Sequence, residues 1–531
     1  MRALSPAEKE AVLVEVQSRV LAAKDLLTER DTNFDLAAVV NDALYHERRR
    51  LDTHRSGPGW KSDVAFWKGV SKRLSKASER ELRDILGSVI HRYLEEIIGN
   101  FDPKVYRVAT KVIPYALSGL LNTMSPTRLL SGFDSLASLD DHLIVRGELD
   151  TISKLIELGT VILVPTHLSN MDSPVIGYSL FKVGLPPFTY GAGLNLFTNP
   201  IIGYFMHNLG AYKVDRLKRD DLYKDTLKEY ATYTLEMGIH NLFFPGGTRS
   251  RSGSLEKKLK LGLLGTGVLA YQNNLRNRKE KPKIFVVPCT LSYSLVLEAE
   301  TLIEDSLKEA GKARYIITDD EFSKPGRILN FLRSLISLDS RIYVTFSEPL
   351  DPFGNRVLPD GTSVDHRGRP IDISGYVMSD GQVRHDEARD AEYTRELGDA
   401  VMRTFAKDNT LLATHLLATV LFQMCKERHP KLDLYRLLRE SALQSEGFPL
   451  IEVHTRTERL LAKLKKLVKD DKVRYGEERL GWDAQAVVSE GLKLFGVYHT
   501  TPAATRRGDR VFPTDPGLLL YYSNRTLPYG L

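Results

Sequence analysis

The sequence predicts an α/β fold, in which a domain with a mostly parallel sheet is flanked by N-terminal and C-terminal helical regions. Three observations lead to this class. Between about 136 and 350, short runs rich in Val, Ile and Phe alternate with helical patterns, as in parallel sheets. Helical periodicity dominates residues 1–135 and returns in residues 396–531. A length of 531 residues accommodates two to four such units.

The first unit, residues 1–135, is predicted to be helical. Ser5-Pro6-Ala7-Glu8 forms a capping box with proline at the first helical position. Apolar residues from Leu82 to Ile98 recur at i, i+3 and i+4, and Gly99 follows as a helix stop. The unit is therefore expected to contain at least two amphipathic helices.

A basic stretch at residues 48–76 separates these helices, and it interleaves cations with Trp60, Phe66 and Trp67. Two interpretations remain open. The stretch contacts a membrane surface, with aromatic rings at the interface and cations at the headgroups. Alternatively, it is a solvated helix face whose aromatic side chains pack inward.

The second unit, residues 136–350, carries the expected strands. Helices are predicted at 220–237 and 256–272 between them. Active sites of such sheets lie at the carboxyl ends of the strands. The strands are predicted at Val161–Pro165, Ala211–Val214, Asn241–Phe244, Ile284–Cys289 and Ile342–Phe346.

Two further units complete the chain. Residues 351–395 are rich in Asp, Gly and Pro, which predicts a long excursion of loops and turns. Residues 396–531 return to helical patterns and contain the longest apolar run, 410–425. That run is shorter than the roughly 20 residues of a membrane-spanning helix. It is a candidate for contact with a membrane surface, as is the apolar segment 194–209.

Composition excludes several classes of protein. The net charge of +6 is too small for a nucleic-acid coat, although it permits attraction to phosphates or anionic lipids. Two cysteines, Cys289 and Cys425, exclude a disulfide framework and a Cys-based zinc site, and they fit a reducing compartment. The first residues lack the apolar stretch of a signal peptide.

Familiar catalytic motifs are absent from the sequence. It contains no GxSxG, no phosphate loop ending in GK[ST], no HExxH and no GxGxxG after a strand. The chain therefore lacks the usual signatures of a serine hydrolase, a nucleotide triphosphatase, a zinc protease and a dinucleotide enzyme.

One pair of residues has the composition of an acid–base site. The predicted strand ending at Pro165 leads into His167, and Asp172 follows five residues later. In a regular helix these side chains would diverge by about 140°, so they meet only if the chain bends between them. A carboxylate on one imidazole nitrogen would leave the other nitrogen able to take a proton from a hydroxyl.

This spacing alone is weak evidence. A second His-x4-Asp, His385 and Asp390, lies in the Asp-rich excursion and follows no strand, so it is interpreted as a chance match. Taken alone, Asp172 is equally well explained as a helix N-cap, and His167 as a buried histidine with satisfied hydrogen bonds.

Cations at the ends of neighbouring strands strengthen the catalytic interpretation. Arg216 ends one predicted strand, and a Gly-rich turn after another carries Arg249 and Arg251. Backbone N–H groups in such a turn bind anions, and guanidinium groups suit phosphate. The further candidate residues nearby are Gly247, Ser250, Lys257, Lys258, Pro288 and Tyr293.

In the order of these blocks, the chain resembles the glycerolipid acyltransferases, most closely the bacterial glycerol-3-phosphate 1-O-acyltransferases. The four blocks of that family match His167 with Asp172, Gly210 with Arg216, the segment 244–251, and Pro288 with Tyr293. Further similarity lies in SYSLVLE, and in 518–525 near the C-terminus. The likeness is good over residues 100–350 and loose over 400–531.

The resemblance implies acyl transfer from a thioester to the sn-1 hydroxyl of glycerol 3-phosphate. His167 would act as general base, and Asp172 would orient it. Arg216, Arg249 and Arg251 would hold the phosphate with Gly247 and Ser250. Candidate contacts to the acyl donor or acceptor are Lys257, Lys258, Pro288 and Tyr293.

One departure from the family pattern concerns position 246. The third block of the family usually carries a glutamate where this chain has Gly246, and that position helps to shape the acceptor site. Other acceptors, such as lysophosphatidic acid, another lysophospholipid or dihydroxyacetone phosphate, therefore stay open. So does a non-catalytic lipid-binding relative.

The resemblance also implies partners and a location. The acyl donor would be acyl-CoA or an acyl carrier protein thioester, and no metal, cofactor or nucleic acid is expected. Because substrate and product are amphiphiles, the protein is expected to act as a peripheral protein at the cytoplasmic face of a membrane, the bacterial inner membrane.

Overall fold

The computed structural model describes residues 4–30, 34–55, 59–112, 142–197, 200–310, 340–439, 445, 447–496 and 499–531. The predicted boundary between the first two units, at 135/136, lies outside these residues. The sheet-bearing part, residues 142–350, is called the sheet domain below.

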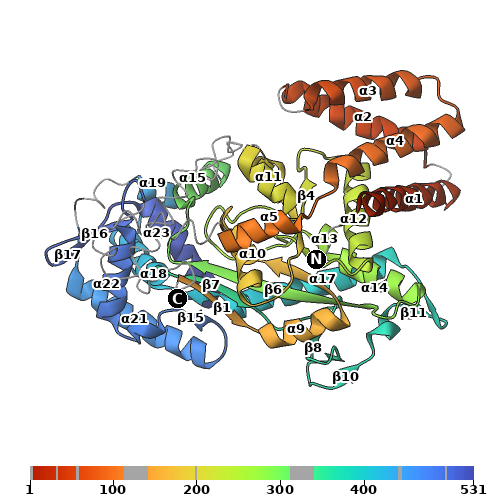
Figure 1. The fold of residues 1–531 in the computed structure, drawn as a ribbon. Helices are drawn as coiled ribbons and strands as arrows, with labels where there is room; N and C mark the ends of the chain where they lie inside the picture. The colour runs from red at the N-terminus through yellow and green to blue at the C-terminus, as the bar shows by residue number, and fades with distance from the viewer. Residues whose placement is uncertain are drawn as a thin grey trace.

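A seven-stranded sheet runs through the sheet domain in the order β1-β7-β6-β2-β5-β3-β4 (Figure 1). All neighbouring pairs are parallel except β6 with β7, so the predicted mostly parallel sheet is confirmed. The strands are β1 (Leu143–Gly147), β2 (Gly159–Pro165), β3 (Thr189–Gly193), β4 (Ala211–Val214), β5 (Asn241–Leu242), β6 (Lys283–Tyr293) and β7 (Ile342–Phe346).

Strand β2 shows why this sheet forms. Its β-branched and aliphatic residues favour an extended backbone, and helices cover both faces of the sheet. Alternate side chains enter different cores: Val161 and Leu163 face one hydrophobic cluster, and Ile162 and Val164 face another. The strand is therefore fixed from both sides up to Pro165, where the site begins.

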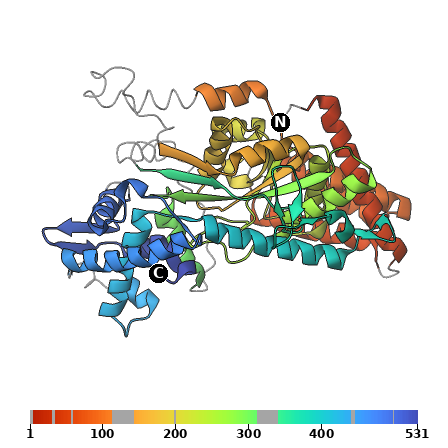
Figure 2. The ribbon, with the colours of Figure 1, turned by 90° about the horizontal axis from the view of Figure 1, so that it is seen from below.

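Helices of the sheet domain connect its strands and cover its faces (Figures 1 and 2). Helix α10 follows β2, and α12 follows β4. The helices are α9 (Leu149–Leu158), α10 (Asp172–Lys182), α11 (Pro200–Asn208), α12 (Asp221–Glu236), α13 (Leu261–Leu264), α14 (Thr266–Arg276) and α15 (Ala299–Ala310), with a 3₁₀ turn at Leu194–Phe197.

Four helices precede the sheet domain and pack on one another and on α12, beside one end of the sheet (Figure 1). The predicted capping box is present, since Ser5 N donates to Glu8 Oε2 at 2.8 Å. The helices are α1 (Pro6–Arg30), α2 (Leu36–Thr53), α3 (Trp60–Leu74) and α4 (Glu79–Ile97), followed by the short α5 (Pro103–Arg107) and a π-helical turn, Val108–Val112.

The basic stretch of this region follows the second of its two interpretations. Trp67 is buried, and Trp60 and Phe66 pack against the same hydrophobic cluster of α1, α2 and α4. Lys61, Lys68 and other cations of α3 point to solvent. The aromatic rings therefore belong to the core of the helical bundle.

The Asp-rich excursion is a series of tight turns between two-residue strands. Asp351 Oδ1 accepts hydrogen bonds from Phe353 N and Asn355 N, and Asp365 does the same for the turn that follows it. These aspartate side chains thus stabilise the turns by accepting backbone hydrogen bonds. The strands are β8 (Arg356–Val357), β9 (Ser363–Val364), β10 (Pro370–Ile371), β11 (Met378–Ser379) and β12 (Gln382–Val383), with a 3₁₀ turn at Ile373–Tyr376.

Helix α17 runs along the sheet domain and packs on α13, α14 and β6. The rest of the C-terminal region lies at the end of the sheet domain opposite the N-terminal bundle (Figures 1 and 2). The whole C-terminal region is largely helical. It consists of α17 (Glu387–Asp408), β13 (Thr410–Leu411), α18 (Ala413–Arg428), α19 (Leu434–Leu438), β14 (Phe448–Pro449), α21 (Leu450–Lys469), β15 (Arg474–Tyr475), a 3₁₀ turn (Glu478–Leu480), α22 (Ala484–Phe495), β16 (Ala504–Arg507), β17 (Arg510–Pro513), α23 (Pro516–Ser523) and a 3₁₀ segment, Asn524–Tyr529.

The predicted membrane contact at 410–425 is wrong. Helix α18 is buried on almost every side, between α21, α22 and α23, so its apolar run forms the core of the C-terminal region. Among the described helices, none combines the length and the apolar character that crossing a bilayer requires.

Candidate active site

The bend that the spacing of His167 and Asp172 requires is present. Strand β2 ends at Pro165, and α10 begins at Asp172 after a turn in which Asp172 N donates to Ser169 O at 3.1 Å. The Asp172 carboxylate folds back over this turn, where Oδ2 accepts from Leu168 N at 2.7 Å and from Ser169 N at 2.9 Å. These backbone hydrogen bonds fix the position of the Asp172 carboxylate independently of its bond to the histidine.

His167 and Asp172 form a hydrogen-bonded pair. His167 Nδ1 lies 2.8 Å from Asp172 Oδ2, and the hydroxyl of Tyr293 on β6 donates to Asp172 Oδ1 at 2.6 Å. Because the fully buried carboxylate accepts at Nδ1, the imidazole presents Nε2 as its proton acceptor. Among the described residues, no hydrogen bond occupies Nε2.

The environment of His167 favours its neutral, basic form. Its ring stacks on Phe244 with centroids 4.0 Å apart, and its side chain is only 12% exposed. Burial lowers the pKa of His167 below its usual 6.5, against the opposing effect of Asp172. The positive charges of Arg249 and Arg216 lower that pKa further.

The second His-x4-Asp pair has the same bond but a different setting. His385 Nδ1 also lies 2.8 Å from Asp390 Oδ2 at the start of α17, yet the His385 side chain is 54% exposed. The hydrogen bond to Asp390 raises the pKa of His385, whereas burial dominates at His167. The two-residue strand β12 (Gln382–Val383) ends just before His385, so the expectation that this pair follows no strand is wrong. Strand β12 belongs to a two-stranded sheet with β11, whereas β2, which leads into His167, lies in the middle of the seven-stranded sheet.

We expect the two histidines to titrate on opposite sides of pH 6.5, His167 below and His385 above. The imidazolium form is penalised by burial at His167 and stabilised by Asp390 at His385. The measurement is an NMR titration of the histidine ring signals, assigned with His167→Asn and His385→Asn. An apparent pKa of His167 above that of His385 would contradict the expectation.

The Gly-rich turn between β5 and α13 lies directly against the pair. Gly247 adopts a positive φ of 77°, which glycine tolerates best, and Ser250 N donates to His167 O at 2.7 Å. The Ser250 hydroxyl donates to Ser254 O within the same loop. Ser250 therefore holds the loop and the histidine backbone together.

Arg249 lies close enough to the pair for its charge to act on His167. Arg249 Nη1 lies 3.1 Å from Glu298 Oε1, and Glu298 also accepts from Ser169 Oγ at 2.6 Å and from Asn170 N at 3.0 Å. This buried glutamate of the SYSLVLE segment therefore bonds both to the turn after β2 and to Arg249. The loop that carries Arg249 and Arg251 is called the arginine loop below. Arg251 follows on that loop, where its charge acts on Asp305.

Arg216 lies at the end of β4 and lines a cavity of about 420 Å³ beside the histidine. The cavity is walled by apolar and glycine residues and edged by lysines: Gly191, Gly193, Val214, Lys224, Leu227, Lys228, Phe243, Phe244, Gly247, Thr248, Lys260, Gly262 and Leu263. Within the described part of the chain, Arg216 has no ion-pair partner. Partial burial and the charge of Arg249 lower the pKa of Arg216, so this cavity is lined by a cation that no acid of the described residues neutralises.

Four candidate contacts do not line this cavity. Pro288 and Tyr293 are buried in β6, where the Tyr293 hydroxyl donates to Asp172, so a contact of either residue with a substrate stays a prediction. Lys257 and Lys258 are exposed on the loop after the arginines. The described residues contain no cluster of side chains suited to a metal ion.

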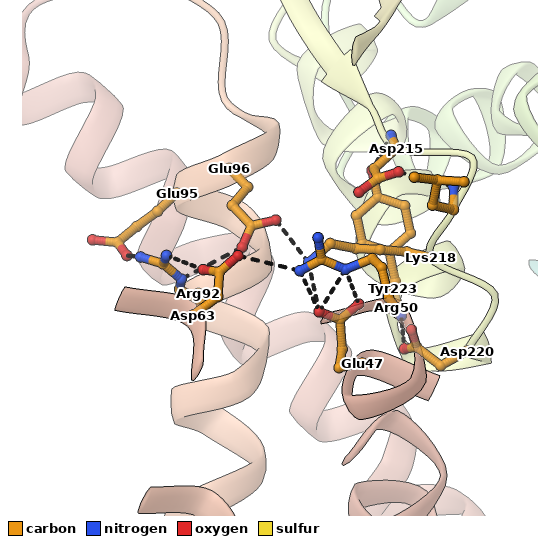
Figure 3. Close-up of polar contacts among 11 residues, drawn as sticks. Glu47, Arg50, Asp63, Arg92, Glu95, Glu96, Asp215, Lys218, Asp220 and Tyr223 are labelled. Atoms are coloured by element: carbon orange, nitrogen blue, oxygen red, sulfur yellow. Dashed lines mark hydrogen bonds and ion pairs between the residues drawn. The ribbon is translucent and has the colours of Figure 1, made fainter. Parts of the chain in front are cut away.

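A buried ion-pair network fixes the loop that follows Arg216 (Figure 3). The Lys218 side chain is 1% exposed, and Nζ lies 2.7 Å from Glu96 Oε2 and 3.5 Å from Glu47 Oε2. Arg50 pairs with Glu47 and with Asp63, at 2.7 and 3.2 Å. The N-terminal helices therefore hold the strand end that presents Arg216, a role that sequence patterns did not reveal.

The C-terminal region supports the arginine loop from the other side. Asn524 Nδ2 donates to Ser252 O at 2.9 Å, and Arg525 Nη2 donates to Leu291 O of β6 at 2.8 Å. A Cβ on Gly253 would lie 2.3 Å from Tyr521 O, so only glycine fits at this contact. The likeness noted around residues 518–525 thus falls on residues that shape the site.

Comparison with known proteins agrees with this geometry. Residues 148–292, which span the pair and all three arginines, match the family model described as acyltransferase. Two relatives are named glycerol-3-phosphate acyltransferase: one from Pseudomonas paraeruginosa, 25% identical over 342 residues (62% of this chain and 36% of the relative), and one from Histophilus somni, 29% identical over 282 residues (53% and 29%). The chain spans only about a third of the length of these relatives.

Proposed function

We propose, from the acyltransferase domain that residues 148–292 match, that the chain transfers a fatty acyl group from a thioester to the sn-1 hydroxyl of glycerol 3-phosphate. The product would be lysophosphatidic acid. The observation that carries the proposal is the His167–Asp172 pair beside Arg216, a cation without a partner in the described residues. A base with such a neighbouring cation would suit an acceptor that has both a hydroxyl and a phosphate.

In this mechanism, His167 Nε2 takes the proton of the acceptor hydroxyl while its oxygen attacks the thioester carbonyl. The tetrahedral intermediate collapses to the new ester, the C–S bond breaks, and the imidazolium returns the proton to the thiolate. Asp172 stabilises the imidazolium, and general-base catalysis of this kind contributes about 10²–10⁴-fold. No covalent enzyme intermediate is required.

The arginines would receive the acceptor phosphate. Arg216 and Arg249 act on the same imidazole and on each other, so a dianion between them would relieve their mutual repulsion. Gly247, which carries no side chain, would let the backbone approach the phosphate, and Arg251 would add charge at the loop. Lys257 and Lys258, exposed beside the loop, would meet the anionic acyl donor, either acyl-CoA or a carrier-protein thioester.

We also propose that the protein works as a peripheral protein at the cytoplasmic face of a membrane. The segment before β4 supports this: Leu194 is 38% exposed and Tyr204 is 57% exposed, although Met206 is buried. Apolar side chains at the surface would contact lipid where an amphiphilic product leaves.

The test is transfer of palmitoyl from its CoA thioester to labelled glycerol 3-phosphate, with phospholipid vesicles. Lysophosphatidic acid is the expected product. If none forms, carrier-protein thioesters are tried as donors, and dihydroxyacetone phosphate and lysophosphatidic acid as acceptors. No product from any of these combinations would refute the acyltransferase proposal and favour a lipid-binding protein.

Arg216→Gln is expected to raise KM for the acceptor by about 10- to 100-fold, because a hydrogen bond to a charged group contributes about 1.5–3 kcal/mol. KM for the acyl donor should change little. Arg219→Gln is the matched control, since Arg219 is exposed on the same loop. Equal effects of the two substitutions would contradict a phosphate site at Arg216.

A further inference from the structure

Glu256 lies in the loop after the arginines, and its carboxylate reaches back to the catalytic pair. Glu256 Oε1 accepts a hydrogen bond from His167 N at 2.8 Å. Because Ser250 N donates to His167 O at 2.7 Å, the same loop holds the histidine by both its N–H and its carbonyl. The ring position of His167 thus depends on this loop and on the Glu256 side chain.

The Glu256 side chain also lies against Gly246. A Cβ built on Gly246 would be 3.0 Å from Glu256 Cγ and 3.4 Å from Glu256 Oε1. The backbone at Gly246 has no positive φ, so an L-residue is permitted there apart from this crowding. The room that a side chain at position 246 would occupy is therefore taken by the side chain of Glu256.

The charge of Glu256 is buried and matched by a cation from the C-terminal region. Burial raises the pKa of Glu256, whereas the His167 N–H and the charge of Arg525 favour its ionised form. Arg525 is 2% exposed, and within the described residues its only hydrogen bond is to Leu291 O. The carboxylate is thus placed by the His167 N–H, and the charge of Arg525 acts on it without a hydrogen bond between them, since Glu256 Oε2 has no hydrogen-bond partner among the described residues.

We propose that Glu256 is a positioning residue for His167, and that its side chain, ten positions downstream of Gly246, fills the space from which a carboxylate at position 246 would act on the same histidine. The catalytic part of this inference rests on the proposed acyl transfer. The structural part does not rest on acyl transfer. It states that side-chain carboxylates at positions 246 and 256 compete for one space, and that either can fill it.

The test moves the carboxylate from position 256 to position 246. Glu256→Ala is expected to lower kcat by about 10- to 100-fold, the range for a lost hydrogen bond to a charged group, with little change in donor KM. Gly246→Glu alone should also lower kcat and the melting temperature, because two carboxylates are then forced together. The double variant Gly246→Glu/Glu256→Ala should recover both quantities to within about threefold in kcat.

Conservative and matched controls sharpen the result. Glu256→Gln keeps an oxygen for the His167 N–H, so it should retain more activity than Glu256→Ala. Glu280→Ala removes an exposed glutamate of the sheet domain and should leave kcat and melting temperature unchanged.

Two outcomes would overturn the inference: a Glu256→Ala enzyme with wild-type kcat, or a double variant that is no more active and no more stable than Glu256→Ala. If wild type transfers no acyl group to any acceptor, the proposed function fails separately. The melting temperatures of the single and double variants then decide whether the two positions share one carboxylate site.

Discussion

Replacing His167 with asparagine is expected to lower kcat by about 10²–10⁴-fold, the usual contribution of a general base. The substitution removes Nε2, which is the only proton acceptor that the pair offers. Acceptor KM should change little, because Arg216 and Arg249 remain. The measurement is steady-state acyl transfer, with the melting temperature to show that the fold is intact.

The chain supplies a control for this experiment. His385→Asn removes a histidine with the same spacing and the same 2.8 Å bond to its aspartate, outside the site. It should leave kcat within about twofold of wild type. Similar losses from both substitutions would mean that His167 acts through stability and not as the base.

Replacing Lys218 with methionine is expected to destabilise the N-terminal bundle by about 3 kcal/mol, near the lower end of the range for breaking a buried ion pair. The lower end applies because Glu47 keeps Arg50 at 2.7 Å. Since Lys218 holds the loop after Arg216, acceptor KM should rise while donor KM does not. Trp60 and Trp67 lie in α3, so chemical unfolding is followed by their fluorescence.

Arg219→Met is the control for Lys218, because Arg219 is adjacent in sequence but exposed. It should change neither stability nor acceptor KM. If Lys218→Met lowers stability and leaves acceptor KM at the wild-type value, the network supports the bundle but does not position Arg216.

The strands that the sequence predicted are buried strands, because burial requires apolar residues and these form a recognisable run. Strands β2, β4 and β7 and the start of β6 coincide with apolar runs. Strand β3, Thr189–Gly193, was missed because its two glycines interrupt any apolar run, and β1 because Arg146 does the same. Both lie in the outer half of the sheet, where side chains are only half-buried.

The order of residues along the chain predicted much of the site. Contacts between residues far apart in the sequence could not be predicted in this way. His167, Asp172 and the three arginines follow strand ends, so a parallel sheet brings them to one edge. Glu298, Glu256 and Lys218 carry no such signal, because an acidic or basic residue in a loop is usually solvated. Their importance comes from burial against distant partners, which one sequence does not display.

The apolar run of α18 led to a wrong prediction of membrane contact for a related reason. A helix that is apolar on all sides is typical both of a protein core and of a lipid contact, and composition does not separate them. Only the helices packed around it, α21, α22 and α23, show that it is a core helix.

The contact between Asn524 and Ser252 also bears on how the protein is made. These residues are 272 positions apart, so at roughly 5–20 residues per second the ribosome needs roughly 15–55 s to pass from one to the other. During that interval the arginine loop has been synthesised, but the residues against which it packs have not. Newly made chains would therefore carry the loop of Arg249 and Arg251 without its packing partners until α23 emerges, which makes this stage of translation the natural point for chaperone protection or for loss to proteolysis.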